Sequence, residues 1–137
     1  MESKEEIAST VAPRVGGSYS QAIRAGDFVF LSGQTPRDRN RAIVDGVFAE
    51  HVRQTLKNLA AVAEAAGTSL DHAVKVNVYL RNWSDFDEMD RVYREYFSEP
   101  RPARTTVQSD LPVDVEVDAI LWVGGTQPSS ARQERTQ

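Results

Sequence analysis

The sequence of 137 residues predicts an α+β domain in which two helices pack on one face of a β-sheet. Two long segments place apolar residues three and four positions apart, which is typical of helices. Several shorter segments alternate apolar and polar residues, which is typical of strands. These segments follow one another in the order β-β-(β)-α-β-α-β-β. A chain of this length can bury one substantial core, so we expect one domain.

The domain is expected to span residues 16–124. Residues 1–15 are mostly polar, and we expect them to form a flexible N-terminal segment. Residues 125–137 contain almost nothing to bury and are expected to be a disordered tail.

Residues 18–34 predict a β-hairpin, because two strand-like runs flank the short glycine-containing connection at 25–27. A polar loop follows, with a short strand expected at 42–44. The first helix is expected over 46–66, capped by Asp45 and ended by Gly67. Its apolar stripe consists of Phe48, Val52, Leu56, Leu59, Ala63 and Ala66.

Strict alternation over residues 74–81 predicts a strand with one covered face. Ser84 is expected to cap the second helix, which the prolines at 100 and 102 prevent from continuing. Its buried stripe is expected to consist of Phe86, Met89, Tyr93 and Tyr96 or Phe97. Two further strands are predicted at 103–109 and 115–123.

The sheet face without helices would carry Tyr79, Ile120 and Trp122. So wide an apolar area is unfavourable in water, and a second copy of the same surface is the simplest cover. The sequence therefore predicts a closed, symmetric homo-oligomer.

Composition excludes several classes of function. The net charge of −4 provides no general attraction for phosphates, so we expect no nucleic-acid partner. The chain has no cysteine, and its two histidines, His51 and His72, have no partner at ligand spacing, so we expect no metal. The polar N-terminus and the absence of a long apolar run predict a soluble, cytoplasmic protein with no membrane contact.

Two charged residues are candidates for chemistry. Arg104 enters a strand directly after a rigid proline segment, and a guanidinium can hold a carboxylate by two parallel hydrogen bonds. Glu116 lies on the sheet face opposite the helices, where a neighbouring subunit would desolvate it and raise its pKa. An ordinary surface arginine and a solvated glutamate are the alternatives. Ser32 and Gly33 end a strand where a substrate could approach the backbone, or where the strand has a bulge.

The chain resembles the RidA/YjgF family of reactive-imine deaminases. The resemblance runs from about residue 16 to residue 123 and rests on seven segments in register: "SYSQAI" (18–23), "FLSGQTP" (30–36), "RQTLKNLAAVAEAAG" (53–67), "VKVNVYL" (74–80), "FDEMDRVYREYF" (86–97), "RPARTTV" (101–107) and "LPVDVEVDA" (111–119). It implies a chorismate-mutase-like fold with a mixed sheet, assembled as a homotrimer with sites between subunits.

The resemblance also implies an activity. Active members hydrolyse 2-aminoacrylate, 2-iminopropanoate and 2-iminobutanoate to 2-oxo acids and ammonia, without cofactor or metal. Arg104 matches the family arginine that binds the substrate carboxylate, and Glu116 matches the glutamate that activates water. Tyr19, Ser32 and Gly33 match residues that line the site. Thr106 stands where several members have a pocket cysteine, and Asp90 where asparagine is common.

Two alternatives stay open beside general imine deamination. One is a pathway-specific deaminase acting on another unsaturated amino acid. The other is a non-catalytic trimer that binds small carboxylates or client proteins.

Overall fold

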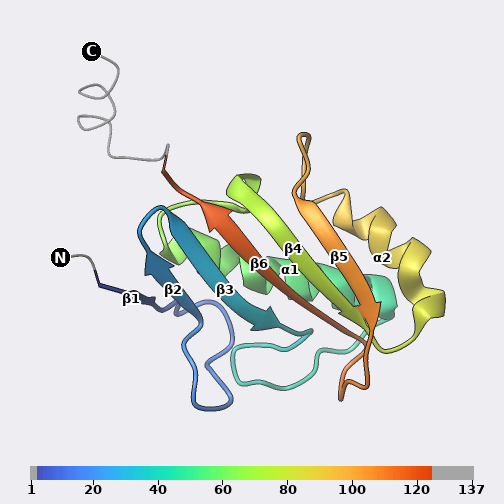
Figure 1. Cartoon of the computed structure of the whole chain (residues 1–137). Coiled ribbons are helices and arrows are strands. Elements are labelled where there is room, and N and C mark those ends of the chain that lie inside the picture. The colour runs from blue at the N-terminus through green and yellow to red at the C-terminus, as the bar shows by residue number, and fades with distance from the viewer. Residues whose placement is uncertain (1–2, 125–137) are drawn as a thin grey trace.

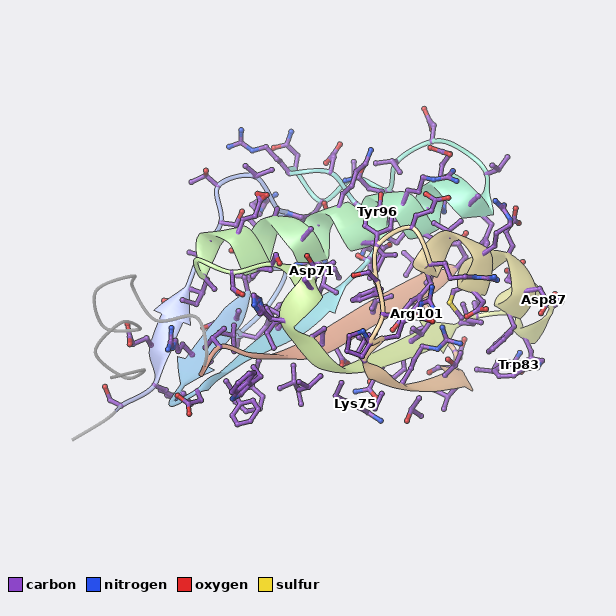
Figure 2. The ribbon with its side chains drawn as sticks, turned by 90° about the horizontal axis from the view of Figure 1, so that it is seen from above. Asp71, Lys75, Trp83, Asp87, Tyr96 and Arg101 are labelled. Carbon is purple, nitrogen blue, oxygen red and sulfur yellow. The ribbon has the colours of Figure 1, made fainter. Side chains whose placement is uncertain are left out.

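Six strands and two helices make up residues 3–124, the part of the chain that the computed structural model describes (Figure 1). The strands are β1 (Glu5–Ile7), β2 (Ala22–Ala25), β3 (Phe28–Gln34), β4 (Ala73–Leu80), β5 (Ala103–Gln108) and β6 (Val115–Trp122). The helices are α1 (Phe48–Ala65) and α2 (Phe86–Tyr93), with single 3₁₀ turns η1 (Leu70–His72) and η2 (Trp83–Asp85). Both helices lie over the same face of the sheet (Figure 2), which confirms the predicted fold class.

The strands form one mixed sheet in the order β1-β2-β3-β6-β4-β5. The pair β4 and β5 is parallel and is connected through α2, whereas every other neighbouring pair is antiparallel. A parallel pair needs such a crossover, because its strands run in the same direction. The last strand, β6, is inserted between β3 and β4 and thus lies at the centre of the sheet.

The core lies between the sheet and the helices. Alternate residues of β6 are buried as predicted: Val115, Val117, Ala119 and Leu121, with Val123 just beyond the strand. They belong to the same apolar cluster as Leu56 and Leu59 of α1. Burying a side chain of this size stabilises the fold by about 1.5–3 kcal/mol, so this layer supplies much of the driving force.

One residue of β4 differs from the predicted alternation. Val76, Val78 and Leu80 are fully buried, but Val74 is 43% exposed. The pairing of β4 with β6 shifts register between Ala73 and Lys75. This irregularity places Ala73 in the core in place of Val74.

The predicted helix ends are partly wrong. Val47 occupies the N-cap position of α1, and no side chain caps it, so Asp45 does not have the expected role. Ser84 lies within η2, which leads directly into α2 and leaves no place for a serine cap. The end of α1 is as predicted, since Gly67 adopts a left-handed conformation with φ of 80°.

The N-terminal segment is more ordered than the sequence predicts. Strand β1 pairs with β2. The buried side chain of Gln21 holds the segment that follows β1 through two hydrogen bonds. The Gln21 amide donates to the Pro13 carbonyl at 2.8 Å and accepts from the Ser9 amide at 2.5 Å. These bonds explain why a polar sequence is fixed here. The predicted tail at 125–137 lies outside the described residues.

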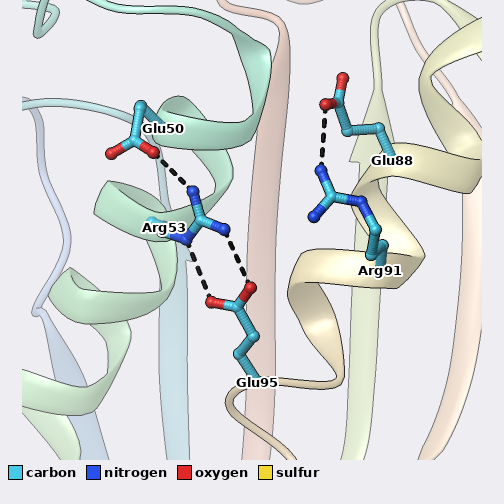
Figure 3. A network of polar contacts seen from close by, with 5 residues as sticks. All are labelled: Glu50, Arg53, Glu88, Arg91 and Glu95. Carbon is cyan, nitrogen blue, oxygen red and sulfur yellow. Dashed lines mark hydrogen bonds and ion pairs between the residues drawn. The ribbon is translucent and has the colours of Figure 1, made fainter.

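Ion pairs join the two helical regions at the surface (Figure 3). Arg53 of α1 donates to Glu50 on its own helix and to Glu95 just after α2. These bonds lower the pKa of the Glu95 carboxyl below its ordinary value.

The predicted strand at 42–44 is reduced to an isolated bridge between Arg37 and Ile43.

Candidate active site

A cavity of about 130 Å³ opens where the end of β3 meets β6 and the loops around residues 13–19 and 35–41. The residues that line the cavity include Arg14, Tyr19, Gly33, Arg37, Arg41 and Glu116.

Glu116 projects from β6 on the face opposite the helices, because its neighbours Val115 and Val117 point into the core. Its carboxylate lies against the backbone of Gly33, where any Cβ would overlap with Glu116 Oε2. Burial raises the pKa of the Glu116 carboxyl above its ordinary value. The charge of Asp118 raises this pKa further, while Arg37 opposes the shift. A partly desolvated carboxylate of this kind is suited to accept a proton from water.

Asp118, the next residue on this face of β6, accepts a hydrogen bond at each of its two carboxylate oxygens. Asn77 donates to one oxygen at 2.8 Å, and the Tyr79 hydroxyl donates to the other at 2.8 Å. The bond to Asp118 raises the pKa of Tyr79 to about 12, so the phenol stays protonated. Asp118 therefore acts as a fixed negative neighbour of Glu116.

Tyr19 and Ser32 lie at the two ends of the hairpin. The Tyr19 hydroxyl accepts the Gly16 amide at 3.1 Å, which fixes the ring although it is largely exposed. The Ser32 hydroxyl donates to the Ser20 carbonyl at 2.6 Å. Ser32 thus braces the hairpin beside the cavity, while Tyr19 and Gly33 line it.

Arg104 lies elsewhere on the chain. It projects from β5 toward α2, where Nη1 donates to Asp90 Oδ1 at 2.8 Å. Its guanidinium carbon lies 4.6 Å from the ring centre of Tyr93 and 5.5 Å from that of Phe86. Both contacts restrict the guanidinium and stabilise its charge. Thr106, two residues further along β5, is half-buried on the same face.

The predicted site residues therefore form two groups. Tyr19, Gly33 and Glu116 share the cavity, with Ser32 beside it. Arg104 and Thr106 pair in register with the core residues Val76 and Val78 and so face the helices. Glu116 faces the other way, and β4 separates it from β5. One copy of the chain does not bring the two groups together.

Several polar residues at or near the cavity were not predicted from the sequence. Arg14, Arg37 and Arg41 all line the cavity, and "RDRNR" at 37–41 is the signal that could have found two of them. His51 is only partly exposed and bonds through Nδ1 to Asp114 and through Nε2 to the Val44 carbonyl. These two bonds connect α1 to two loops. The sequence shows only one histidine in a helix and does not indicate its partners.

The described residues hold no group of three or more His, Cys, Asp or Glu side chains placed to bind a metal ion. None of the helices within residues 3–124 is long and apolar enough to cross a membrane.

Comparison with known proteins identifies the family. The family model described as Endoribonuclease L-PSP matches residues 9–123, which is most of the chain. The chain belongs to this family, also known as the RidA/YjgF family. The resemblance predicted from the sequence is thereby confirmed.

Individual members of the RidA/YjgF family are similar over nearly their whole length. A RutC family protein of Pyrococcus horikoshii is 48% identical, over 87% of this chain and 98% of that protein. A 2-iminobutanoate/2-iminopropanoate deaminase of Dermatophagoides farinae is 38% identical, over 90% of this chain and 99% of that protein. The crystal structure of RidA from an Antarctic Psychrobacter is 39% identical, with a TM-score of 0.82 over 87% of this chain and 99% of that one.

Proposed function

We propose that this protein hydrolyses reactive imine and enamine intermediates of 2-oxo acids, such as 2-iminobutanoate and 2-aminoacrylate, to the 2-oxo acid and ammonia. The observation that carries the proposal is the placement of Glu116. Its carboxylate has a raised pKa and lies in a small cavity directly against the Gly33 backbone. The Dermatophagoides relative carries the name of this activity.

The reaction needs little from the protein, because an imine is already electrophilic at carbon and an enamine such as 2-aminoacrylate first tautomerises to the imine by moving a proton from nitrogen to carbon. Water adds to the carbon of the C=N bond, and the nitrogen leaves as ammonia. Glu116 orients this water and takes up its proton, and the backbone around Gly33 is close enough to hydrogen-bond polar atoms of the substrate. Arg104 binds the substrate carboxylate.

Because Arg104 and Glu116 face opposite sides of the sheet, we place the complete site between subunits of a homotrimer. The open face of the sheet supports this assembly. It exposes Phe28, Phe30 and Trp122, each 40–46% accessible, and Phe28 stands opposite Trp122 in the sheet. Covering these aromatic rings with a second copy would remove a large apolar area from water.

The proposal is tested by generating 2-iminobutanoate in place with a threonine dehydratase and following its decay. Wild type should accelerate the decay, whereas Arg104→Ala and Glu116→Gln should each lose at least about tenfold in kcat/KM. Arg101→Ala is the matched control, because Arg101 is a nearby arginine that pairs with Glu99 and the Phe97 carbonyl outside the site. Wild type without acceleration would refute the deaminase, and Arg104→Ala with full activity would refute the role given to Arg104.

A non-catalytic carboxylate-binding trimer is the outcome if ligands bind without any acceleration. Analytical ultracentrifugation of the same samples tests the assembly, and a mass of one chain would contradict a site between subunits.

A further inference from the structure

The cavity contains more positive charge than the proposed reaction uses. Arg14, Arg37 and Arg41 line it together with one carboxylate, that of Glu116. Within residues 3–124, none of these three arginines lies within 4.0 Å of a carboxylate oxygen. By contrast, Arg104, the arginine expected to bind the substrate, is already paired with Asp90.

This charge is notable in an acidic chain. Carboxylates outnumber lysines and arginines, 20 to 16, so an arginine has many available partners. Among residues 3–124 the arginines that form ion pairs are Arg53, Arg91, Arg94, Arg101 and Arg104, which lie on α1, on or just after α2, and on or just before β5. The cavity gathers three arginines around the single carboxylate of Glu116, and among the described residues none of the three is within ion-pair distance of a carboxylate. Such a site is electrostatically suited to an anionic group of a ligand.

The loop that carries Arg37 is fixed by the fold. The buried amide of Asn58 on α1 donates to the Thr35 carbonyl at 3.0 Å and to the Arg37 carbonyl at 2.8 Å. The Arg37 side chain donates from Nη1 to the Thr35 hydroxyl at 3.0 Å, which leaves its remaining N–H groups for a ligand. Arg37 is also the arginine whose charge acts on Glu116.

A further hydrogen bond fixes the cavity wall around Arg41. Its backbone has a positive φ of 71°, and Nη1 donates to the Arg14 carbonyl at 3.1 Å. The Arg41 guanidinium covers Gly16 so closely that a Cβ at residue 16 would overlap with it. The three cations are thus attached to backbone held in place before any ligand binds, which lowers the entropic cost of binding.

We propose that this cavity binds a second carboxylate, so that the preferred substrates are imines and enamines of dicarboxylic 2-oxo acids. The proposal rests on the proposed function and names its substrate class. The first carboxylate binds Arg104 of a neighbouring copy, water attacks the C=N carbon beside Glu116, and the distal carboxylate binds Arg37. The distal group takes no part in the chemistry: one water is consumed, one ammonia is released, and the product is a 2-oxo dicarboxylate. Arg37 is therefore a specificity-determining residue.

The test uses stable product-like acids, so that it does not depend on turnover. 2-Oxoglutarate and 2-oxobutanoate differ by one terminal carboxylate, and their binding to the full chain is measured by isothermal titration calorimetry. Wild type should bind 2-oxoglutarate about tenfold or more tightly, the gain expected from one charge-assisted contact. Arg37→Gln should lose that advantage and keep its affinity for 2-oxobutanoate within about twofold.

Arg24→Gln is the control, because Arg24 lies on β2 away from the cavity and bonds to the Gly26 carbonyl. It should change neither affinity, and thermal melts of both variants should match wild type. Equal binding of the two acids by wild type, or no binding of either, would overturn the proposal. So would an Arg37→Gln variant that loses both ligands equally, since Arg37 would then hold the carboxylate common to them. These results are separate from the imine-decay assay, whose failure would refute the deaminase itself.

Discussion

Glu116 can take up its position because Gly33, the residue that its carboxylate lies against, has no side chain. Its carboxylate occupies the space that a Cβ at residue 33 would fill. The glycine at residue 33 therefore leaves room for the Glu116 carboxylate. The three atoms nearest to a Cβ at residue 33 all belong to the Glu116 side chain, so the end of β3 could accommodate a larger residue if Glu116 moved away.

Gly33→Ala should consequently reduce activity more than stability. The new methyl group meets the end of a flexible side chain, so Glu116 rotates and the backbone keeps its place. We expect a loss of about tenfold or more in kcat/KM, with an unfolding free energy within about 1 kcal/mol of wild type. Gly17→Ala is the control, because its Cβ would meet only the Tyr19 ring at 3.4 Å. An active Gly33→Ala enzyme would show that the glutamate does not need this position.

The raised pKa of Glu116 also affects stability. Below the ordinary glutamate pKa of 4.5, the carboxyl is protonated in both the folded and the unfolded chain. As pH rises through the higher folded pKa, the folded chain must ionise a partly buried group, so wild type loses stability over that interval. Glu116→Gln carries no such charge and should be more stable than wild type at pH 7, with the difference shrinking toward pH 4.

Urea denaturation at both pH values measures this effect. Glu64→Gln, which changes an exposed glutamate of α1, should show no comparable pH-dependent gain. A wild type that equals or exceeds Glu116→Gln at pH 7 would contradict the effect of burial.

If Arg104 binds the substrate as proposed, Asp90 competes with the substrate for this arginine. Its two oxygens bond to Arg104 at 2.8 Å and to Arg94 at 3.3 Å, so part of the arginine's hydrogen-bonding capacity is used within the chain. Asp90→Asn should lower KM for an anionic imine by about threefold to tenfold and leave kcat within about twofold. Glu88→Gln on the same helix should leave both constants unchanged, because Glu88 pairs with Arg91. An unchanged KM in Asp90→Asn would show that the ion pair does not limit binding.

The site could be predicted from the sequence where strand alternation or the resemblance to the family singled out a residue. Glu116 and Gly33 were found because alternation in β6 and the end of β3 place them on known faces. The arginines of the cavity were missed, because they come from loops and only the folded chain brings Arg14 beside Arg37 and Arg41. The net charge of −4 hides this local excess of positive charge.

Helix α1 links the core to the candidate site. One side of the helix packs Leu56 and Leu59 into the core, while Asn58 reaches the loop that carries Arg37. Periodicity predicts such a helix well, since its apolar stripe is long. It does not predict the caps, because Asp45 and Ser84 are good capping residues that the actual backbone path leaves outside the cap positions.

Asn58→Ala should therefore destabilise the chain and loosen the cavity together. The substitution removes the Asn58 donor from the Arg37 carbonyl and one of the two donors of the Thr35 carbonyl, which also accepts the Arg37 backbone amide, and we expect a loss of about 1–3 kcal/mol in unfolding free energy. Lys57→Ala, at the exposed neighbouring position, should stay within about 0.5 kcal/mol of wild type. Urea titration at a fixed chain concentration makes the comparison, and a loss in Asn58→Ala no larger than the control's would show that the loop does not depend on α1.

At the level of the whole molecule, the sheet separates Arg104 and Glu116, the two residues that the proposed reaction requires in one site. Arg104, which we propose binds the substrate carboxylate, lies against α2 on one face, and Glu116, which we propose activates water, lies on the other. Two copies of the chain can resolve this only if the open face of one meets the β5 edge of the next. A trimer arranged in this way would form three equal sites, each taking Arg104 from one subunit and Glu116 from its neighbour.

Mixed trimers test this division directly. Arg104→Ala chains still carry Glu116, and Glu116→Gln chains still carry Arg104, so each variant alone should be inactive. When the two variants are co-expressed, some interfaces in the mixed trimers combine the intact Arg104 of one chain with the intact Glu116 of the other. A site shared between subunits therefore predicts that imine hydrolysis returns in the mixture, to a substantial fraction of wild-type activity. If both residues act from the same chain, no interface contains an intact pair and co-expression restores nothing. Mixing the separately purified variants without exchange of subunits is the control, since it supplies the same chains but no mixed interface.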